Sequence, residues 1–441
     1  MKRRIAVVAA IAATLLGAAA CSKGGTGSGA ASSNPLDGTG KTLKVWLMVD
    51  AQSGWPGVVD AATAKFKADT KADVKIEYQP WTGHLTKLDA ALAGADAPDV
   101  IELGNTEASK YVFTGGLADI TDKKSTFDNN ANWLTGLAEP VEADGKLYGV
   151  PYYAGARALI YRTDLFQAAG LKPPTSYDEL LTAADKLQKA NASDPKFSAF
   201  YMPPKYWYAA MSWVYAKGGA IAKKDGSTWK GTLEDSASVE GLTAWADLAR
   251  KYSKGDQTKD EADQDQVWAQ GHGAMMYGNG WEVGAVQSQP TNPNDPNSAK
   301  ADTAVKGKVA AAPMPGFNGK GMPTFLGGSI LGVTGKSKNK DLAAEWLKDF
   351  TSTDSMKGLI AKGALPNATN LLDDAAKVSG NEATALAAKE SWFTPNAPKW
   401  ADVEKAAILK QMLADIVTNK ATIAAATKSA DEQIAKILNE S

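Results

Sequence analysis

The sequence predicts an α/β protein built from two lobes. Apolar strand patterns alternate with helical patterns between residues 43 and 103. A second set of strands and helices begins near Tyr153. Extended stretches at Gly149–Tyr153 and Val309–Pro315 contain proline and are typical of crossings between lobes. The chain of 441 residues is long enough for about two to three domains.

The first lobe is predicted from a β-α-β-α-β pattern. Leu43–Val49 is a continuous apolar run, Val74–Tyr78 alternates, and Asp99–Leu103 forms a third strand, with helical spacing between them. This order implies a parallel sheet covered by helices. Ligands of such sheets bind beyond the carboxyl ends of the strands. The candidate binding residues that follow the three strands are Asp50, Gln52, Trp81, Asn105 and Glu107.

The second lobe is predicted to begin with a strand at Ala158–Tyr161. Residues 201–215 are rich in aromatic side chains, and the pattern leaves open whether Tyr206 and Trp207 face the core or a cleft. The role of Arg157 is also left undecided, because its side chain could reach a cleft or form a salt bridge between the lobes.

The stretch Gly271–Val283 reads GHGAMMYGNGWEV. Gly273–Tyr277 predicts a short buried strand, and Gly278–Gly280 predicts a turn with positive φ. Trp281 follows the turn at once. An indole on such a loop presents a rigid apolar face and one N–H donor, which suits a sugar ring. The same pattern fits a core tryptophan that closes a hydrophobic edge.

The last third of the chain predicts one more strand followed mostly by helices. Gly327–Ser329 leads into a strand at Ile330–Val333, and Asp341–Phe350 has a helical pattern. Residues from 354 onward are mostly helical, with an interruption at Trp392–Trp400. The candidate ligand contacts outside the first-lobe strand ends are Tyr153, Arg157, Trp207, Trp281 and Gly328.

The N-terminal residues predict export and anchoring. A positive start, an apolar stretch too short to span a bilayer and small residues precede Cys21, the single cysteine of the chain. This resembles a bacterial lipoprotein signal in which Cys21 becomes the lipidated N-terminus, with Ala18 in place of the usual leucine. Ordinary secretion with an unrelated cysteine is the alternative. Residues 22–40 are rich in glycine and serine, which predicts a flexible tether.

Composition argues against several function classes. The formal net charge of −1 gives no reason to expect nucleic acid or a polybasic membrane surface. Two histidines and one cysteine leave no metal site, and no cofactor motif is present, so no metal and no cofactor are expected. Tryptophan (13) outnumbers phenylalanine (10), which indicates that some tryptophans bind a ligand. An anchored glycosidase is an alternative, and it would need two carboxylates about 5–10 Å apart.

Short motifs, in this order and spacing, resemble the extracellular solute-binding proteins of ATP-driven sugar importers, the group that includes the maltose-binding protein. The resemblance covers Thr42–Ile437. Within the family the chain looks closest to the actinobacterial chitobiose-type binders, which share the VWLM strand and the VELGN-like loop. The matching motifs are VWLMVD at 45–50, PDVIELGN at 98–105, YGVPYYAGARALIYRTDLF at 148–166, GHGAMMYGNGW at 271–281, APMPG at 312–316, GGSILGV at 327–333, AAEWLKDF at 343–350 and NAPKW at 396–400.

The resemblance implies the periplasmic-binding-protein-like fold, in which each lobe is a mainly parallel sheet flanked by helices and a hinged cleft lies between the lobes. A third crossing is implied near Phe350–Asp354. The implied divisions are a signal peptide at 1–20, an anchor and linker at 21–40, a first lobe at 41–153 plus 314–352, and a second lobe at 154–313 plus 353–441.

The resemblance also implies roles for single residues. Asp50 would hydrogen-bond sugar hydroxyls, Asn105 and Glu107 would contact sugar from the next loop, and Trp281 would stack on a sugar ring. The residues that could supply a late aromatic contact are Trp400 and, if the alignment shifts, Trp392 or Phe393.

The function implied is capture and not catalysis. A monomeric, membrane-anchored protein would bind a sugar, such as chitobiose or another disaccharide, and deliver it to the permease of an ABC importer. A peptide, a polyamine or glycerol phosphate is the alternative ligand.

Overall fold

The computed structural model describes residues 36–256, 259–260, 264–291 and 299–440. The predicted signal segment, Cys21 and the tether up to residue 35 lie outside the described residues. Leu36 onward forms one compact unit. Leu36 packs against its core and the Gly38 amide donates to the Thr70 carbonyl at 2.7 Å. The predicted tether therefore ends earlier than residue 40.

The first sheet has the strand order β2-β1-β3-β15-β6. Strand β1 pairs in parallel with β2 and β3, whereas β15 is antiparallel to β3 and β6. Leu43, Val45 and Leu47 of β1 are fully buried, whereas Trp46 is partly buried against the same core. The strands are β1 (Thr42–Met48), β2 (Asp73–Gln79), β3 (Val100–Gly104), β6 (Val150–Gly155) and β15 (Gly327–Val333).

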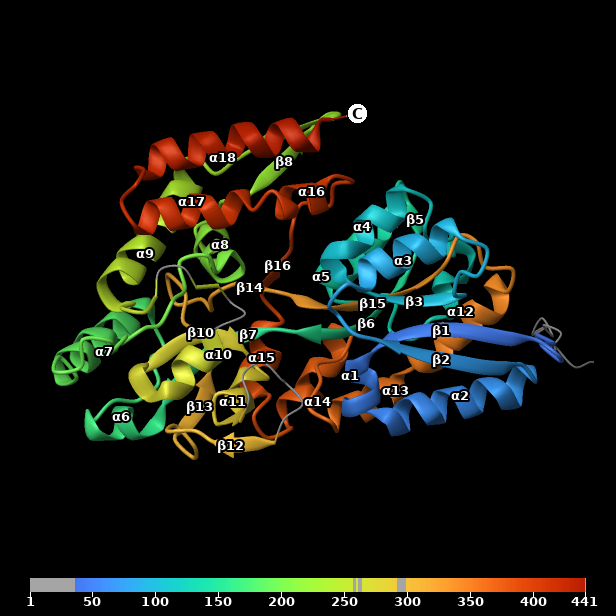
Figure 1. Cartoon of the computed structure of the whole chain (residues 1–441), viewed down its shortest axis with the longest axis horizontal. Helices are drawn as coiled ribbons and strands as arrows, with labels where there is room; N and C mark the ends of the chain where they lie inside the picture. Colours follow the sequence, from blue (N-terminus) through green and yellow to red (C-terminus); the bar gives the residue numbers. More distant parts are fainter. Residues whose placement is uncertain (1–35, 257–258, 261–263, 292–298, 441) are drawn as a thin grey trace, which may run out of the picture. The chain divides into compact units, whose positions relative to one another are not determined.

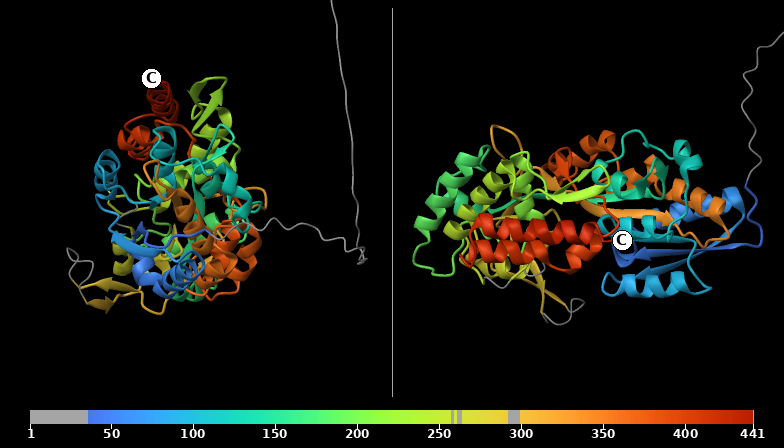
Figure 2. Two further views of the ribbon diagram at one scale, coloured as in Figure 1. Left: turned by 90° about the vertical axis from the view of Figure 1, so that its right-hand side faces the viewer. Right: turned by 90° about the horizontal axis from the view of Figure 1, so that it is seen from above.

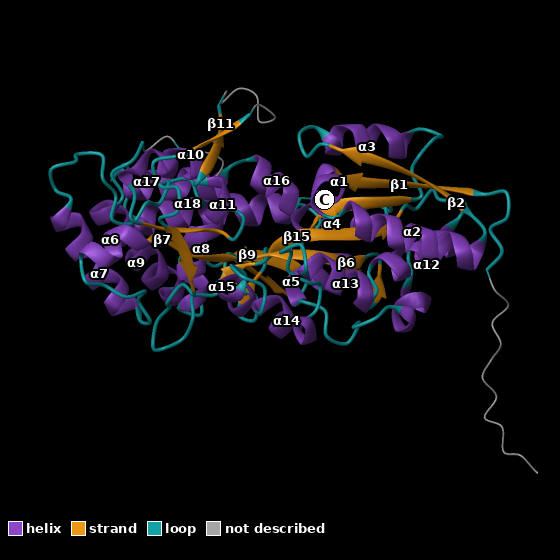
Figure 3. Ribbon diagram, turned by 90° about the horizontal axis from the view of Figure 1, so that it is seen from below, coloured by secondary structure: helices purple, strands orange, loops and turns teal. Residues whose placement is uncertain are grey.

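Helices cover both faces of this sheet. Helix α2 packs beside α12 and lies below the sheet in Figure 1, while α3 and α4 lie above it. Figure 3 shows the same strands side by side between these helices. A short helix follows β1 directly. The helices are α1 (Val49–Gly54), α2 (Pro56–Thr70), α3 (His84–Ala93), α4 (Asn105–Phe113) and α12 (Lys340–Phe350).

The second sheet has the order β10-β7-β13, with β10 at Met275–Asn279, β7 at Arg157–Arg162 and β13 at Val309–Ala312. Both neighbours run antiparallel to β7. The expectation of a mainly parallel sheet is therefore wrong for this lobe. Strand β7 leads the chain into the second lobe. The chain returns to the first core only at Leu326, because Met314, Met322 and Phe325 still pack in the second core, which is later than the crossing expected at Val309–Pro315.

The second lobe has its own hydrophobic core around Leu159, Trp213 and Trp245. The last two helices of the chain, drawn in red in Figure 2, pack side by side and cover it. Its helices are α6 (Thr163–Ala168), α7 (Tyr177–Ala190), α8 (Trp207–Ala216), α9 (Ser236–Tyr252), α17 (Ile408–Val417) and α18 (Ile423–Leu438).

The third crossing lies later than expected. Helices α13 (Thr353–Ile360) and α14 (Leu372–Ala376) follow Phe350 and bury their apolar residues in the first core. The chain reaches the second core only at Trp392, where β16 (Ser391–Trp392) pairs with β14 (Thr324–Phe325). This packing does not fit the expected placement of residues 353–388 in the second lobe. The sequence of an amphipathic helix does not show which of two hydrophobic cores its apolar face packs against.

The remaining elements are short. No described helix is both long and apolar enough to cross a membrane, and the described residues hold no cluster of histidine, cysteine or acidic side chains suited to a metal ion. The short elements are α5 (Thr135–Ala138), β4 (Glu142–Ala143), β5 (Lys146–Leu147), β8 (Ala222–Asp225), β9 (Thr228–Gly231), α10 (Gln264–Val267), α11 (Glu282–Ala285), β11 (Ser288–Pro290), β12 (Lys300–Asp302), α15 (Glu382–Ala387), α16 (Trp400–Lys405), the 3-10 turns Thr121–Thr126, Glu139–Val141 and Thr369–Leu371, and the π turn Trp268–His272.

Candidate functional site: a cleft at the crossings

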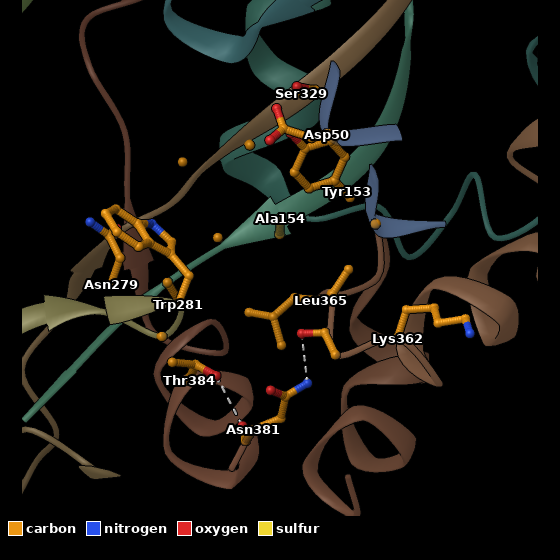
Figure 4. A pocket seen from close by; sticks show the side chains of 18 of the residues that line it. Asp50, Tyr153, Ala154, Asn279, Trp281, Ser329, Lys362, Leu365, Asn381 and Thr384 are labelled. Carbon is orange, nitrogen blue, oxygen red and sulfur yellow. Dashed lines mark hydrogen bonds between the residues drawn. The ribbon is translucent and has the colours of Figure 1, made fainter. Parts of the chain in front are cut away.

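A cleft of about 860 Å³ lies where the chain crosses between the two sheets. This volume falls within the usual range for small-molecule sites. Figure 4 shows that its walls come from widely separated segments. The lining residues are Asp50, Ser53, Gly54, Trp55, Trp81, Tyr153, Ala154, Gly155, Ala156, Asn279, Gly280, Trp281, Gly327, Gly328, Ser329, Lys362, Gly363, Ala364, Leu365, Asn381 and Thr384.

Asp50 and Trp81 form one wall. Asp50 lies in the first turn of α1, directly after β1. The indole N–H of Trp81 donates to the Asp50 carboxylate, and the His84 ring lies edge-on to Trp81 at 5.3 Å. These two contacts hold the Trp81 ring in place, and 37% of the residue remains exposed to solvent. This wall offers a charged acceptor beside an apolar face.

The floor is made by the ends of β6 and β15. Tyr153 lies opposite Ser329, and a register shift follows Ser329 in β15. Gly328 has a φ of +134°, and a Cβ there would lie 2.2 Å from the Tyr153 carbonyl oxygen. A side chain at Gly328 is therefore excluded. The glycine lets two strands approach closely beneath the cleft.

Glu102 lies buried beneath this floor. Its Oε2 accepts the Met48 amide at 2.8 Å, and its Oε1 has no hydrogen-bond partner among the described residues. Burial raises the pKa of Glu102 to about 7 because the charged form loses solvation. Burial likewise raises the pKa of the Tyr153 hydroxyl well above its ordinary value.

Trp281 forms the opposite wall and is 65% exposed, far more than other large apolar side chains that the structure describes. It follows β10, whose last residue pairs with Arg157 at the crossing. The predicted positive φ in the preceding turn is wrong for both Gly278 and Gly280. They are small for another reason: a Cβ would lie 2.8 Å from the Glu282 carboxylate or 2.9 Å from the Thr384 methyl group, respectively.

A further wall comes from residues that the sequence pattern did not single out. The Asn381 amide donates to the Gly363 carbonyl at 3.0 Å, and the Thr384 hydroxyl donates to the Asn381 carbonyl at 3.0 Å. Figure 4 shows both side chains below Trp281, with Lys362 farther along. Two glycines with left-handed backbone lie at this wall, Gly363 with φ at +88° and Gly380 with φ at +90°.

The cleft brings together five of the predicted site residues and leaves out six. Those that line it are Asp50, Trp81, Tyr153, Trp281 and Gly328. Those that lie outside its lining are Gln52, Asn105, Glu107, Arg157, Trp207 and Trp400. Gln52 is exposed on α1.

Asn105 and Glu107 bond to other segments of the first lobe and do not line the cleft. The buried Asn105 amide donates to the carbonyls of Gly136 and Leu326, both at 2.8 Å. Glu107 accepts the Gly104 amide at 2.8 Å and contacts His84 Nε2 at 3.0 Å, which caps the start of α4. Neither residue lines the cleft, and their contact with a ligand stays a prediction.

Arg157 is buried at the first crossing. Its Nε donates to the Tyr206 hydroxyl, and its guanidinium lies 5.3 Å from the Tyr208 ring centroid. Its main-chain N–H donates to the Thr324 hydroxyl at 3.0 Å. Arg157 therefore ties two crossing segments to α8, and it does not line the cleft.

The predicted aromatic contacts Trp207 and Trp400 are core residues. Trp207 stacks on Tyr208 at 3.9 Å, and the Trp400 indole donates to Glu404 at 2.6 Å. The alternative Trp392 is also buried and donates to Ser212 at 3.1 Å. Neither they nor Phe393 line the cleft.

The chemistry of the lining favours binding over hydrolysis. Asp50 is the sole carboxylate in the lining that the structure describes, whereas glycosidases require a pair. Indole faces, a carboxylate and side-chain amide and hydroxyl groups are suited to a flat polar ligand with C–H faces. A cleft of this kind between two α/β lobes defines a binding protein for a small polar solute.

The chain belongs to the bacterial extracellular solute-binding proteins, whose family signature matches residues 61–388. This confirms the predicted family and its two-lobed α/β fold class. The proteins of this family bind solutes and are not enzymes.

Two curated relatives match nearly the whole chain. The diacetylchitobiose binding protein DasA of Streptomyces coelicolor is 34% identical over 412 residues, covering 92% of this chain and 91% of the relative. The maltodextrin-binding protein MdxE of Bacillus subtilis is 24% identical over 419 residues, covering 91% and 90%. The solved sugar-binding protein MalE of Xanthomonas citri has a TM-score of 0.73 at 22% identity, covers 90% and 97% of the two chains, and shows the shared fold.

Proposed function

We propose that this chain is a lipid-anchored extracellular binding protein that captures a sugar and delivers it to an ABC importer by closure of its lobes. The observation that carries the proposal is the exposed Trp281 across the cleft from Asp50. An exposed indole on a cleft wall has an energetic cost that a stacked sugar ring would offset.

The ligand we favour is a disaccharide of the chitobiose type. The relative that binds diacetylchitobiose is 34% identical, against 24% for the maltodextrin-binding relative, at similar coverage. Among the described lining residues only Asp50 and Lys362 are charged. This balance favours a neutral ligand over a polyamine or glycerol phosphate.

The anchor and the delivery step extend this proposal. Cys21 would carry the lipid, and the residues up to about 35 would tether the binding unit as a monomer outside the membrane. The first lobe would comprise residues 36–156 and 326–388, and the second residues 157–325 and 391–440, with the crossings between them. Closure over the ligand would create the form that a permease recognises.

The test is a binding panel on the isolated protein by calorimetry and intrinsic fluorescence. The panel holds chitobiose, cellobiose, maltose, xylobiose, N-acetylglucosamine, a dipeptide and spermidine. We expect saturable binding of a sugar, strongest for chitobiose, and about a tenfold or larger loss in Trp281→Ala. Trp229→Ala is the matched control, because that half-buried indole lies outside the cleft lining. Binding of spermidine or the dipeptide alone would contradict the sugar assignment.

A further inference from the structure

Directly behind the exposed Trp281 lies a carboxylate that is removed from solvent. Glu282 is 0% exposed, whereas the preceding residue is 65% exposed. Glu282 is absent from the cleft lining, so it does not reach a ligand there. Ile160, Met276 and Val286 form the small apolar cluster of this region.

The Glu282 carboxylate is bonded to the turn that precedes Trp281. Its Oε2 accepts the Asn279 main-chain amide at 2.5 Å and the Asn279 side-chain amide at 3.3 Å. The same oxygen accepts the Gln264 side-chain amide at 2.8 Å. Charge-assisted bonds of this kind are stronger than neutral ones.

The space around the Glu282 carboxylate is tightly filled by the neighbouring residues. A Cβ at Gly278 would lie 2.8 Å from Glu282 Oε2 and 2.9 Å from Ile160 Cδ1. Gln264, which holds the oxygen from the other side, is itself fully buried. A buried carboxylate is costly unless it is well bonded. Here two of its bonds come from Asn279, so Asn279 and Glu282 are joined across Gly280 and Trp281.

We propose that Glu282 is a positioning residue that fixes Asn279 and Trp281 in the orientation required for ligand stacking. The inference rests on the proposed function, because it assumes that Trp281 contacts the ligand. It adds that the affinity of the cleft depends on a group that never touches the ligand. Orientation of an aromatic wall by a buried anchor lowers the ordering cost of binding.

A double-mutant cycle tests the proposal. Glu282→Leu removes the acceptor, and we expect about a tenfold weaker affinity for the sugar found in the panel, while Glu282→Gln keeps an oxygen and stays within about threefold. In a Trp281→Ala background Glu282→Leu should cost less than about twofold, because the indole it positions is gone. Full additivity of the two losses, or unchanged affinity in folded Glu282→Leu, would overturn the inference.

Asp431→Asn is the matched control. Asp431 is a buried carboxylate that accepts the Leu233 and Glu234 amides at 3.0 and 2.9 Å, outside the cleft lining. We expect this variant to lower the melting temperature and leave affinity unchanged. An equal loss of affinity in this control would show that Glu282 acts only through general stability, and would overturn the inference.

Two further measurements keep the test decisive. Amide hydrogen exchange of the ligand-free protein should be faster at Asn279 in Glu282→Leu; unchanged exchange there would overturn the inference even if no sugar bound. Where Glu282→Leu fails to fold, Gln264→Met removes one bond to the carboxylate and should weaken affinity about threefold only while Trp281 is present. If Trp281→Ala binds like the wild type, the proposed function fails before the positioning role is reached.

Discussion

Replacement of Glu102 by glutamine should change how stability depends on pH. Glu102 is buried under the cleft floor with one hydrogen bond, from Met48. Burial raises its pKa from 4.5 to about 7. The folded chain therefore binds a proton more tightly than the unfolded chain between these two values. In that window the contribution of Glu102 to the free energy of unfolding falls as pH rises.

The size of the effect follows from the two pKa values. The difference between 4.5 and about 7 corresponds to roughly 3 kcal/mol. The stabilising contribution is fully present below pH 4.5 and is lost by the time pH passes 7. Glutamine cannot ionise but retains an oxygen for the Met48 amide. Relative to the wild type, Glu102→Gln should therefore gain roughly 3 kcal/mol between pH 4.5 and pH 8.

Urea denaturation followed by tryptophan fluorescence at pH 4.5 and pH 8 measures this gain. Other buried acids, such as Glu404 with its pKa raised to about 7 by burial, contribute equally to both proteins and cancel in the difference. Glu240→Gln removes an exposed carboxylate of α9 and is the matched control. A stability difference between Glu102→Gln and the wild type that is the same at both pH values would refute the reasoning.

Two other changes test the floor and the anchor. Gly328→Ala should destabilise the fold by about 3 kcal/mol or more, because its Cβ would overlap the Tyr153 carbonyl. Thermal melts compare this variant with Gly284→Ala, where the space around the Cβ is open. Equal melting temperatures of the two variants would contradict this account. Cys21→Ser should release the protein into the culture medium and abolish incorporation of a labelled fatty acid, whereas Ser22→Ala should remain with cells; retention of Cys21→Ser on membranes would argue against the anchor.

Sequence reasoning located the cleft through strand direction. Asp50 follows β1 and Trp281 follows β10, and both strands end at the crossings. The carboxyl end of a buried strand can be read from an apolar run and its boundary. The edge at which such strands end is therefore predictable, and so are the residues that directly follow them.

The role of a residue at that edge was not predictable, because it depends on remote partners. Asn105 follows β3 just as Asp50 follows β1, yet its amide bonds to carbonyls 31 and 221 residues away. Trp400 likewise turns toward Glu404 and the second core. A polar or aromatic side chain near a cleft has two possible uses, and packing from the rest of the chain decides between them.

The two glycines beside Asn279 show that the reason for a glycine can also depend on contacts that the sequence does not show. Glycine in a sequence indicates either a left-handed conformation or a close approach. Neither Gly278 nor Gly280 has a positive φ. Gly278 admits the carboxylate of Glu282, four residues later, and Gly280 admits a methyl group of Thr384, more than a hundred residues later. The first approach is local, but the second exists only because the segment after α14 returns to the turn that carries Trp281. The same return of the chain brings Asn381 and Thr384 to the cleft wall. One long-range contact therefore explains both why these two lining residues were not predicted and why the positive φ predicted for Gly280 was wrong.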